Sequence, residues 1–262
     1  MAETNENTTP EAEEEVPQEE QVDLIELMDM RARTYGMLAR LYRKEVDEDA
    51  LKELQGMRFP VATGNEKVDE GYRLMYEYLR TAWDDSITEL AIDYVRTFIG
   101  HGVNAYSAAY PYESVYTSER RLMMQEARGE VLKSFRQNHL KKGKWNDAED
   151  HIALELEFMQ RMAMRTASSL REGDEDTAIE YLDTQHTFAQ DHLLNWLPMM
   201  TSDMHMFSQT KFYNGLASLT MGYIEEDEAL LGELLDSVEE AEEAEAAAAE
   251  AEARAEAEES ED

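Results

Sequence analysis

The chain has 262 residues and no cysteine, which excludes disulfides, thiolate metal sites and a cysteine nucleophile. Its formal net charge is −35 at pH 7, because 59 acidic residues face 24 basic ones. Binding to phosphates needs a positive face, so nucleic acid is a poor partner for this chain and a cationic peptide is a good one.

Most of the net negative charge lies at the two ends. Residues 1–21 carry 8 acidic and no basic residues, residues 225–262 carry 18 against 1, and the body 22–224 therefore holds only −10 of the −35. The first end is rich in Glu, Thr and Pro and the last is a run of Ala and Glu, so neither buries enough apolar surface to offset its ordering entropy. We predict acidic disordered tails at 1–21 and 238–262 around one folded domain at 22–237. Solubility or a salt-rich host is an alternative reason for the acid.

No segment predicts export or a membrane span. The chain does not start with a basic region followed by an apolar one, and it has no run of about 18 apolar residues. We expect a cytoplasmic protein without stable membrane insertion.

The apolar residues recur at intervals of three and four, which is typical of amphipathic helices. Alternation of the kind that strands need is absent from the sequence, and no internal repeat is visible. Helices are predicted over 22–44, 47–57, 66–82, 86–99, 118–138, 147–171, 175–196, 203–224 and 226–237. The sequence therefore predicts an all-α protein, a single-domain bundle of about nine to ten helices.

An aromatic loop interrupts this pattern between residues 100 and 117. Between Arg96 and Glu113 the chain has no charged side chain except that of His101 when it is protonated, yet it contains Tyr106, Tyr110 and Tyr112. This composition differs from that of a solvated linker, so we expect an ordered loop with a binding role.

The helix predicted after the loop begins with acids. On a wheel of about 100° per residue, His151 and Glu155 point into a wide apolar arc and lie four residues apart. Because burial of either group alone is costly, we predict that they pair, with Asn146 or Asp147 as the N-cap. Two interpretations stay open: a structural pair with a cap, or one wall of a binding groove shared with the aromatic loop.

Sixteen methionines are present, and such side chains can form a compliant peptide-binding surface. Most of them, including Met159 and Met162, are better explained as core. Core packing is also the simplest explanation for His192 and Trp196, which lie four residues apart before a helix end predicted at Pro198.

Several motifs together resemble the TorD/DmsD/NarJ family of chaperones that mature molybdenum-dependent redox enzymes. Residues 97–101 read Thr-Phe-Ile-Gly-His, residues 110–116 read Tyr-Pro-Tyr-Glu-Ser-Val-Tyr, and residues 147–151 read Asp-Ala-Glu-Asp-His. Later marks of the family, His-Leu-x-x-Trp and Phe-Tyr-x-x-Leu, follow in order. The similarity covers roughly 30–225. The chain departs from the family's prolines at His101, Tyr110 and Ala148.

The resemblance implies a cytoplasmic chaperone, not an enzyme, with no cofactor of its own. Its partner would be the catalytic subunit of a molybdopterin oxidoreductase, held as the apo form and through its twin-arginine leader until the cofactor is inserted. Carboxylates and aromatic faces suit the two guanidinium groups and the apolar stretch of such a leader. The chaperone would act as a monomer or a homodimer.

The resemblance also assigns the leader-binding residues, and we expect Asp150 among them to lie on the polar flank of its helix. The assigned positions are Tyr94, Phe98, Gly100, Pro111, Tyr112, Asp150 and His151, with Ser114, Tyr116 and Trp196 as further candidates.

Other classes of function find less support. A helix-bundle metal enzyme needs Glu-x-x-His on two helices, whereas residues 183–186 offer a lone Asp-Thr-Gln-His. Members of the family have been linked to guanine nucleotides, but neither a P-loop nor a Gly-x-Gly-x-x-Gly motif is present. We predict no catalytic or metal-binding residue. A structural interaction module, or a NarJ-type factor for a reductase subunit that is not exported, remains an alternative.

Overall fold

The computed structural model describes residues 18–60, 62–100 and 107–259, and over these ranges it consists of helices and connecting segments without a strand. The all-α prediction is confirmed. His101 and Tyr106 of the predicted aromatic loop lie outside the described residues. In chain order the elements are α1 (Gln18–Arg43), α2 (Glu48–Gly56), α3 (Glu66–Leu79), α4 (Asp84–Tyr94), η1 (Val95–Ile99), α5 (Glu113–Thr117), α6 (Glu126–Gln137), α7 (Ile152–Glu172), α8 (Glu175–Phe188), η2 (Ala189–Leu194), α9 (Leu197–Phe207) and α10 (Lys211–Glu259).

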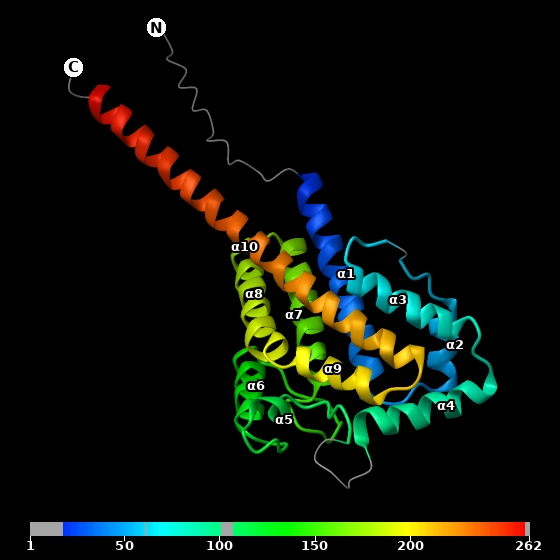
Figure 1. Ribbon diagram of the computed structural model, residues 1–262. Helices are drawn as coiled ribbons and strands as arrows, with labels where there is room; N and C mark the ends of the chain where they lie inside the picture. The colour runs from blue at the N-terminus through cyan, green and yellow to red at the C-terminus, as the bar shows by residue number, and fades with distance from the viewer. Residues whose placement is uncertain (1–17, 61, 101–106, 260–262) are drawn as a thin grey trace.

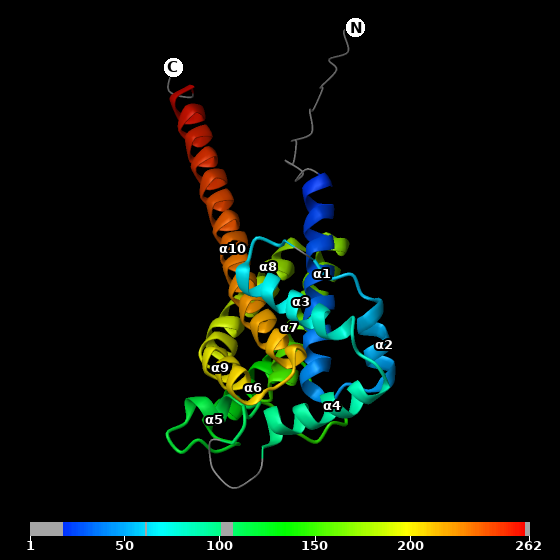
Figure 2. The same cartoon turned by 45° about the vertical axis from the view of Figure 1, so that its right-hand side comes forward.

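The core is built around α7, which packs against α1 and α8 (Figures 1 and 2). The wide apolar arc predicted for this helix is buried. Phe158 on α7 is 2% exposed and stacks on Phe135 of α6, while its other neighbour is Phe188 of α8. The sequence pattern thus correctly identified the apolar face of this helix.

Helix α3 crosses α10 closely because glycines meet there. A Cβ built on Gly71 would lie 2.5 Å from the backbone nitrogen of Leu219, and one on Gly215 would lie 2.7 Å from the carbonyl oxygen of Gly71. Only residues without a side chain allow the two backbones to approach this far.

A buried ion pair joins the first helix to the last. Arg31 Nε donates to Asp227 Oδ1 at 2.6 Å, and both side chains are about 2% exposed. Tyr35 and Gln185 complete the hydrogen bonds of the pair. The pair and its partners therefore connect α1, α8 and α10 inside the core.

Three helix boundaries differ from the prediction. Residues 118–125 are not helical, since Arg121 (φ 51°) and Met124 (φ 60°) adopt left-handed backbone. Pro198 lies in the first turn of α9 and does not end a helix, which agrees with the preference of proline for that turn. The helix predicted over 203–224 is divided at residues 208–210 into α9 and α10.

The prediction of disorder for the second tail is wrong as far as residue 259. Helix α10 continues without a break to Glu259 and projects away from the body (Figures 1 and 2). Residues 239–251 are all exposed, so the segment buries nothing, as expected. Alanine and glutamate have high helix propensity, and extension of a docked helix avoids the cost of nucleation.

Candidate functional site

The aromatic segment and the start of α7 lie side by side. Glu113 N donates to Asp150 O at 2.9 Å and Ile152 N donates to Pro111 O at 3.0 Å, so Tyr112 and His151 form an isolated antiparallel bridge. The two motifs that the sequence analysis placed in one site therefore meet in the structure.

Asp150 is buried at this junction, and its predicted position on a polar helix flank is wrong. Its Oδ2 accepts a hydrogen bond from Ser114 N at 3.0 Å, and the residue is 0% exposed. Burial raises the pKa of its carboxyl group, against the hydrogen bonds from Ser114. Ser114 is also buried, and its Oγ accepts from Gln125 N at 3.0 Å. Asp150 thus links two segments, because the backbone pairing turns it inward before α7 begins.

His151 is the N-cap of α7, so the predicted cap at Asn146 or Asp147 is wrong. Its Nδ1 accepts from Ala153 N at 3.0 Å. Its ring meets the rings of Tyr112 and Trp145 edge to face, with centroids 5.0 and 4.7 Å away. Burial lowers the pKa of His151 to about 4, so the imidazole is neutral at pH 7.

The predicted pair of His151 with Glu155 is not formed. The cap position directs the imidazole back to the backbone, and Glu155 Oε2 instead accepts from Trp196 Nε1 at 3.2 Å. Burial raises the pKa of Glu155 well above its usual value, and the nearby charges of Glu113 and Asp150 add to the shift. Glu155 therefore holds its proton more strongly than an exposed glutamate does.

Glu113 is a buried member of this cluster that the sequence analysis did not select. Its Oε1 accepts from Asn195 Nδ2 at 2.9 Å, and its Oε2 lies 3.1 Å from His192 Nδ1. It is 2% exposed. The only sequence signal for Glu113 is that a charged residue stands directly before Ser114. The hydrogen-bond partners of Glu113 lie about 80 residues away in the sequence.

Two phenol–carboxylate pairs are partly exposed next to this buried cluster. Tyr112 OH donates to Asp147 Oδ1 at 2.8 Å, and Tyr116 OH donates to Asp203 Oδ2 at 3.1 Å. All four side chains are half-buried. Tyr116 also stacks on the fully buried Trp196, with a centroid distance of 5.6 Å.

Burial raises the pKa of both tyrosines, so they remain hydrogen-bond donors. Burial raises the pKa of Asp203 too, while the hydrogen bond from Tyr116 and the charge of Arg121 oppose that shift. An anion that is held by a phenol and half-exposed can receive a guanidinium group. Asp203 was missed because only the packing of α9 brings it to Tyr116.

Three of the predicted residues, Tyr94, Phe98 and Gly100, lie at the end of α4, in η1 and directly after η1. They belong mainly to the core. Tyr94 OH donates to the carbonyl of Tyr42 at 2.9 Å, and burial raises its pKa to about 12. Phe98 packs on Tyr94 and on Tyr213. Gly100 has φ 71°, and a Cβ on it would lie 2.7 Å from Ser107 Oγ, so glycine is required there.

Of the ten predicted residues, seven are buried, and Tyr112 and Tyr116 have partly exposed side chains. The buried ones are Tyr94, Phe98, Pro111, Ser114, Asp150, His151 and Trp196.

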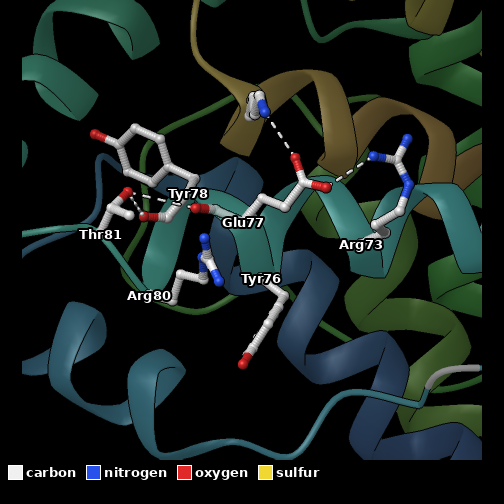
Figure 3. Close-up of a pocket in the computed structure, with 7 residues that line it drawn as sticks. Arg73, Tyr76, Glu77, Tyr78, Arg80 and Thr81 are labelled. Atoms are coloured by element: carbon white, nitrogen blue, oxygen red, sulfur yellow. Dashed lines mark hydrogen bonds and ion pairs between the residues drawn. The ribbon is translucent and has the colours of Figure 1, made fainter.

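Two surface hollows lie elsewhere. The larger one, of about 590 Å³, is formed by α3 and the start of α10 (Figure 3). Its carboxylate, Glu77, bonds to both Arg73 and Lys211, so most of its charge is internally neutralised. The second, of about 360 Å³, lies between α4 and residues 209–210. None of the ten predicted residues lines either hollow.

Two features of other protein classes are absent from the described part of the chain. No helix there is long and apolar enough to cross a membrane. No group of three or more His, Asp or Glu side chains there has an arrangement that could hold a metal ion.

The family model and the curated relatives that this chain resembles agree on one family. The family model described as nitrate reductase delta subunit matches residues 65–202, more than half of the chain. The chaperone protein TorD of Photobacterium profundum is 27% identical over 221 residues, which cover 80% of this chain and 99% of that protein. TorD of Vibrio parahaemolyticus is 28% identical over 211 residues, covering 78% and 95%. A crystal structure of a putative redox enzyme maturation protein from Archaeoglobus fulgidus aligns with a TM-score of 0.41 and 18% identity, over 73% of this chain and 93% of that one.

Proposed function

We propose that this chain, which belongs to the TorD/DmsD/NarJ family of redox-enzyme maturation chaperones, binds the twin-arginine leader and the apo form of a molybdopterin-dependent oxidoreductase. Its relatives are named chaperones, a non-enzymatic role, in agreement with the prediction that the chain is not an enzyme. The chaperone would act in the cytoplasm, assist insertion of the client's cofactor and delay export until the client has folded.

The observation that supports leader binding best is the presence of two half-exposed carboxylates, each held by a tyrosine. A twin-arginine leader presents two guanidinium groups, and each suits one carboxylate in bidentate geometry. In the proposed complex, Asp147 receives one arginine beside the ring of Tyr112. Asp203 receives the other beside Tyr116. The partly exposed rings of both tyrosines would add cation–π contact.

The buried predicted residues would act by positioning these pairs. Asp150 and Ser114 hold the segment that carries both tyrosines, and Trp196 supports the ring of Tyr116. Binding groups whose side chains are locked by their neighbours lose less entropy when a ligand arrives. This explains how a leader could depend on residues that it does not touch.

Calorimetry with synthetic peptides tests the proposal. The chaperone should bind a leader with two consecutive arginines and lose most of its affinity when both become alanine. Asp147→Asn and Asp203→Asn should each weaken binding by about 1–3 kcal/mol, the scale of a hydrogen bond to a charged group. Asp183→Asn, at an exposed position of α8, is the matched control and should leave the affinity unchanged. Equal affinity for the two peptides would refute leader binding.

A second candidate function is assembly of a reductase subunit that is not exported. The matched family model supports it, because its description is that of a nitrate reductase delta subunit. In that case the chaperone would bind the apo catalytic subunit with an affinity that does not depend on an arginine pair. A pull-down of apo subunits with and without their leaders separates the two candidates.

A further inference from the structure

Five large apolar side chains that remain exposed lie on α9 and on the segment after α5. Met199 and Met206 of α9 are 42% and 70% exposed. Leu122, Met123 and Met124 are 48%, 39% and 59% exposed. We call these five side chains the methionine surface. Exposed apolar groups that gather in this way mark sites of interaction more often than singly scattered ones do.

The two parts of the methionine surface are neighbours. Helices α5 and α9 lie side by side in both views (Figures 1 and 2). The hydrogen bond from Tyr116 to Asp203 joins the end of α5 to α9, and the charge of Arg121 acts on Asp203. On α9, Met199, Asp203 and Met206 are spaced by four and three residues, so they share one helix face.

The backbone of residues 118–125 holds its apolar side chains outward. Arg121 and Met124 adopt left-handed conformations that are unfavourable for residues with a side chain. The segment is tied at both ends to Ser114, since Ser118 N donates to Ser114 O at 3.2 Å and Gln125 N donates to Ser114 Oγ at 3.0 Å. These contacts keep three consecutive large apolar residues in positions where about half of each side chain remains exposed.

We infer that the methionine surface binds the apolar run that follows the two arginines of the leader. This inference rests on the proposed function. A leader carries its basic residues directly before an apolar run of about 7–15 residues. Asp203, the proposed partner of one arginine, lies between Met199 and Met206, so the cation and the apolar run of one peptide meet matching groups on one face.

The dimensions and the chemistry of the surface suit this occupant. From Met199 to Met206 the helix rises about 10 Å, and an apolar run of about 12 residues is about 18 Å long when helical. Such a run can cover the exposed face of α9 and reach residues 122–124. Methionine side chains are unbranched and adaptable, and they accept apolar partners of differing shape. One surface could therefore take leaders whose apolar residues vary.

The first test uses methyl NMR of the full chain with ¹³C-labelled methionine. The probe is a synthetic peptide with two arginines followed by about 12 leucines and alanines. Its addition should shift the methyl signals of Met123, Met124, Met199 and Met206. The signals of Met30 and Met164, which are 53% and 45% exposed on α1 and α7, serve as the internal control and should not move.

The second test compares variants by calorimetry. Met199→Gln/Met206→Gln should weaken binding of the probe about tenfold, because two apolar contacts are lost. The control variant Met30→Gln/Met164→Gln should bind within about twofold of the wild type. All four positions are exposed, so unchanged thermal melting verifies that each variant folds.

Two further peptides separate this inference from the proposed function. A peptide with the arginines but with serines in the apolar run should bind the wild type and the Met199→Gln/Met206→Gln variant equally. A peptide with the apolar run but without arginines reports on the methionine surface alone. Suppose that this peptide binds the Met199→Gln/Met206→Gln variant more weakly than the wild type, and that loss of the arginines leaves the affinity unchanged. The methionine surface is then supported and leader recognition through the arginines is refuted. If the substitutions weaken binding of neither apolar peptide, the inference is overturned.

Discussion

At the scale of single residues, burial determines the charge state of the site. His151 is neutral because its ring is enclosed between Tyr112 and Trp145 and its Nδ1 accepts a backbone hydrogen bond. Burial acts on Glu155 in the opposite direction: it raises the pKa of the carboxyl group and so favours the protonated acid. The half-exposed carboxylates beside them, Asp147 and Asp203, are the groups that we propose bind cations. The site that we propose binds a cationic peptide thus keeps this histidine uncharged.

The histidine makes stability depend on pH. Its pKa is about 4 in the folded protein and 6.5 in the unfolded chain, so between these values the unfolded state binds more protons and stability falls as the pH falls. From pH 7 to pH 5 we expect a loss of about 2 kcal/mol from this residue. His151→Asn, which keeps an N-cap acceptor, should lack this component.

Urea unfolding of both proteins at several pH values measures the difference between them. Comparison with the variant cancels the opposite contribution of Asp150 and Glu155, whose raised pKa values favour the folded state as the pH falls. Parallel loss of stability in the two proteins would show that His151 is not the titrating group.

At the scale of elements, the crossing of α3 and α10 depends on two glycines. Gly71→Ala should destabilise the protein by about 1–3 kcal/mol, because the added methyl group meets the backbone of Leu219 and the helices must move apart. Gly129→Ala on α6 is the matched control, since nothing lies within 4 Å of its added Cβ.

Thermal or chemical denaturation measures both effects. The control should be neutral or stabilising by up to about 1 kcal/mol, through the reduced entropy of the unfolded chain. If Gly71→Ala behaves like Gly129→Ala, the two backbones are not in close contact.

At the scale of the whole molecule, much of the negative charge lies on the part of α10 that extends beyond the folded body. Residues 225–262 hold 18 of the 59 acidic residues, yet from 239 to 251 every residue is exposed. Charges so placed act through screened attraction over a Debye length of about 8–10 Å. The helical extension can thus draw in a basic leader without taking part in the core.

Deletion of residues 1–17 and 239–262 tests this role. Association with a twin-arginine peptide should become slower at low salt and the difference should vanish at high salt, while the dissociation rate stays nearly constant. Stopped-flow fluorescence at two salt concentrations measures both rates. The truncated body should melt as the full chain does, and its far-UV circular dichroism should show less helix. Dissociation that becomes severalfold faster, or loss of the folded state, would place the tails in the binding surface or the core.

The all-α class and the apolar arc of α7 could be predicted from the sequence, because apolar periodicity is a property of neighbouring residues. The meeting of residues 110–116 with 147–151 is one of two interpretations that the sequence leaves open, and the resemblance to the family favours it. The orientation of Asp150, the capping role of His151 and the partners of Glu155 could not. Each depends on the pairing of Pro111 and Glu113 with the residues before α7, which turns side chains inward that a helical wheel places on a flank.

Tertiary packing alone decided which groups are accessible. Asp203 reaches Tyr116 only because α9 packs there, and the methionine surface exists because residues 118–125 leave the helical pattern. Sequence analysis assigned most methionines to the core because apolar residues on a helical stripe are usually buried. Whether such a stripe is covered depends on the neighbouring elements, and that is a property of the folded chain rather than of any short segment.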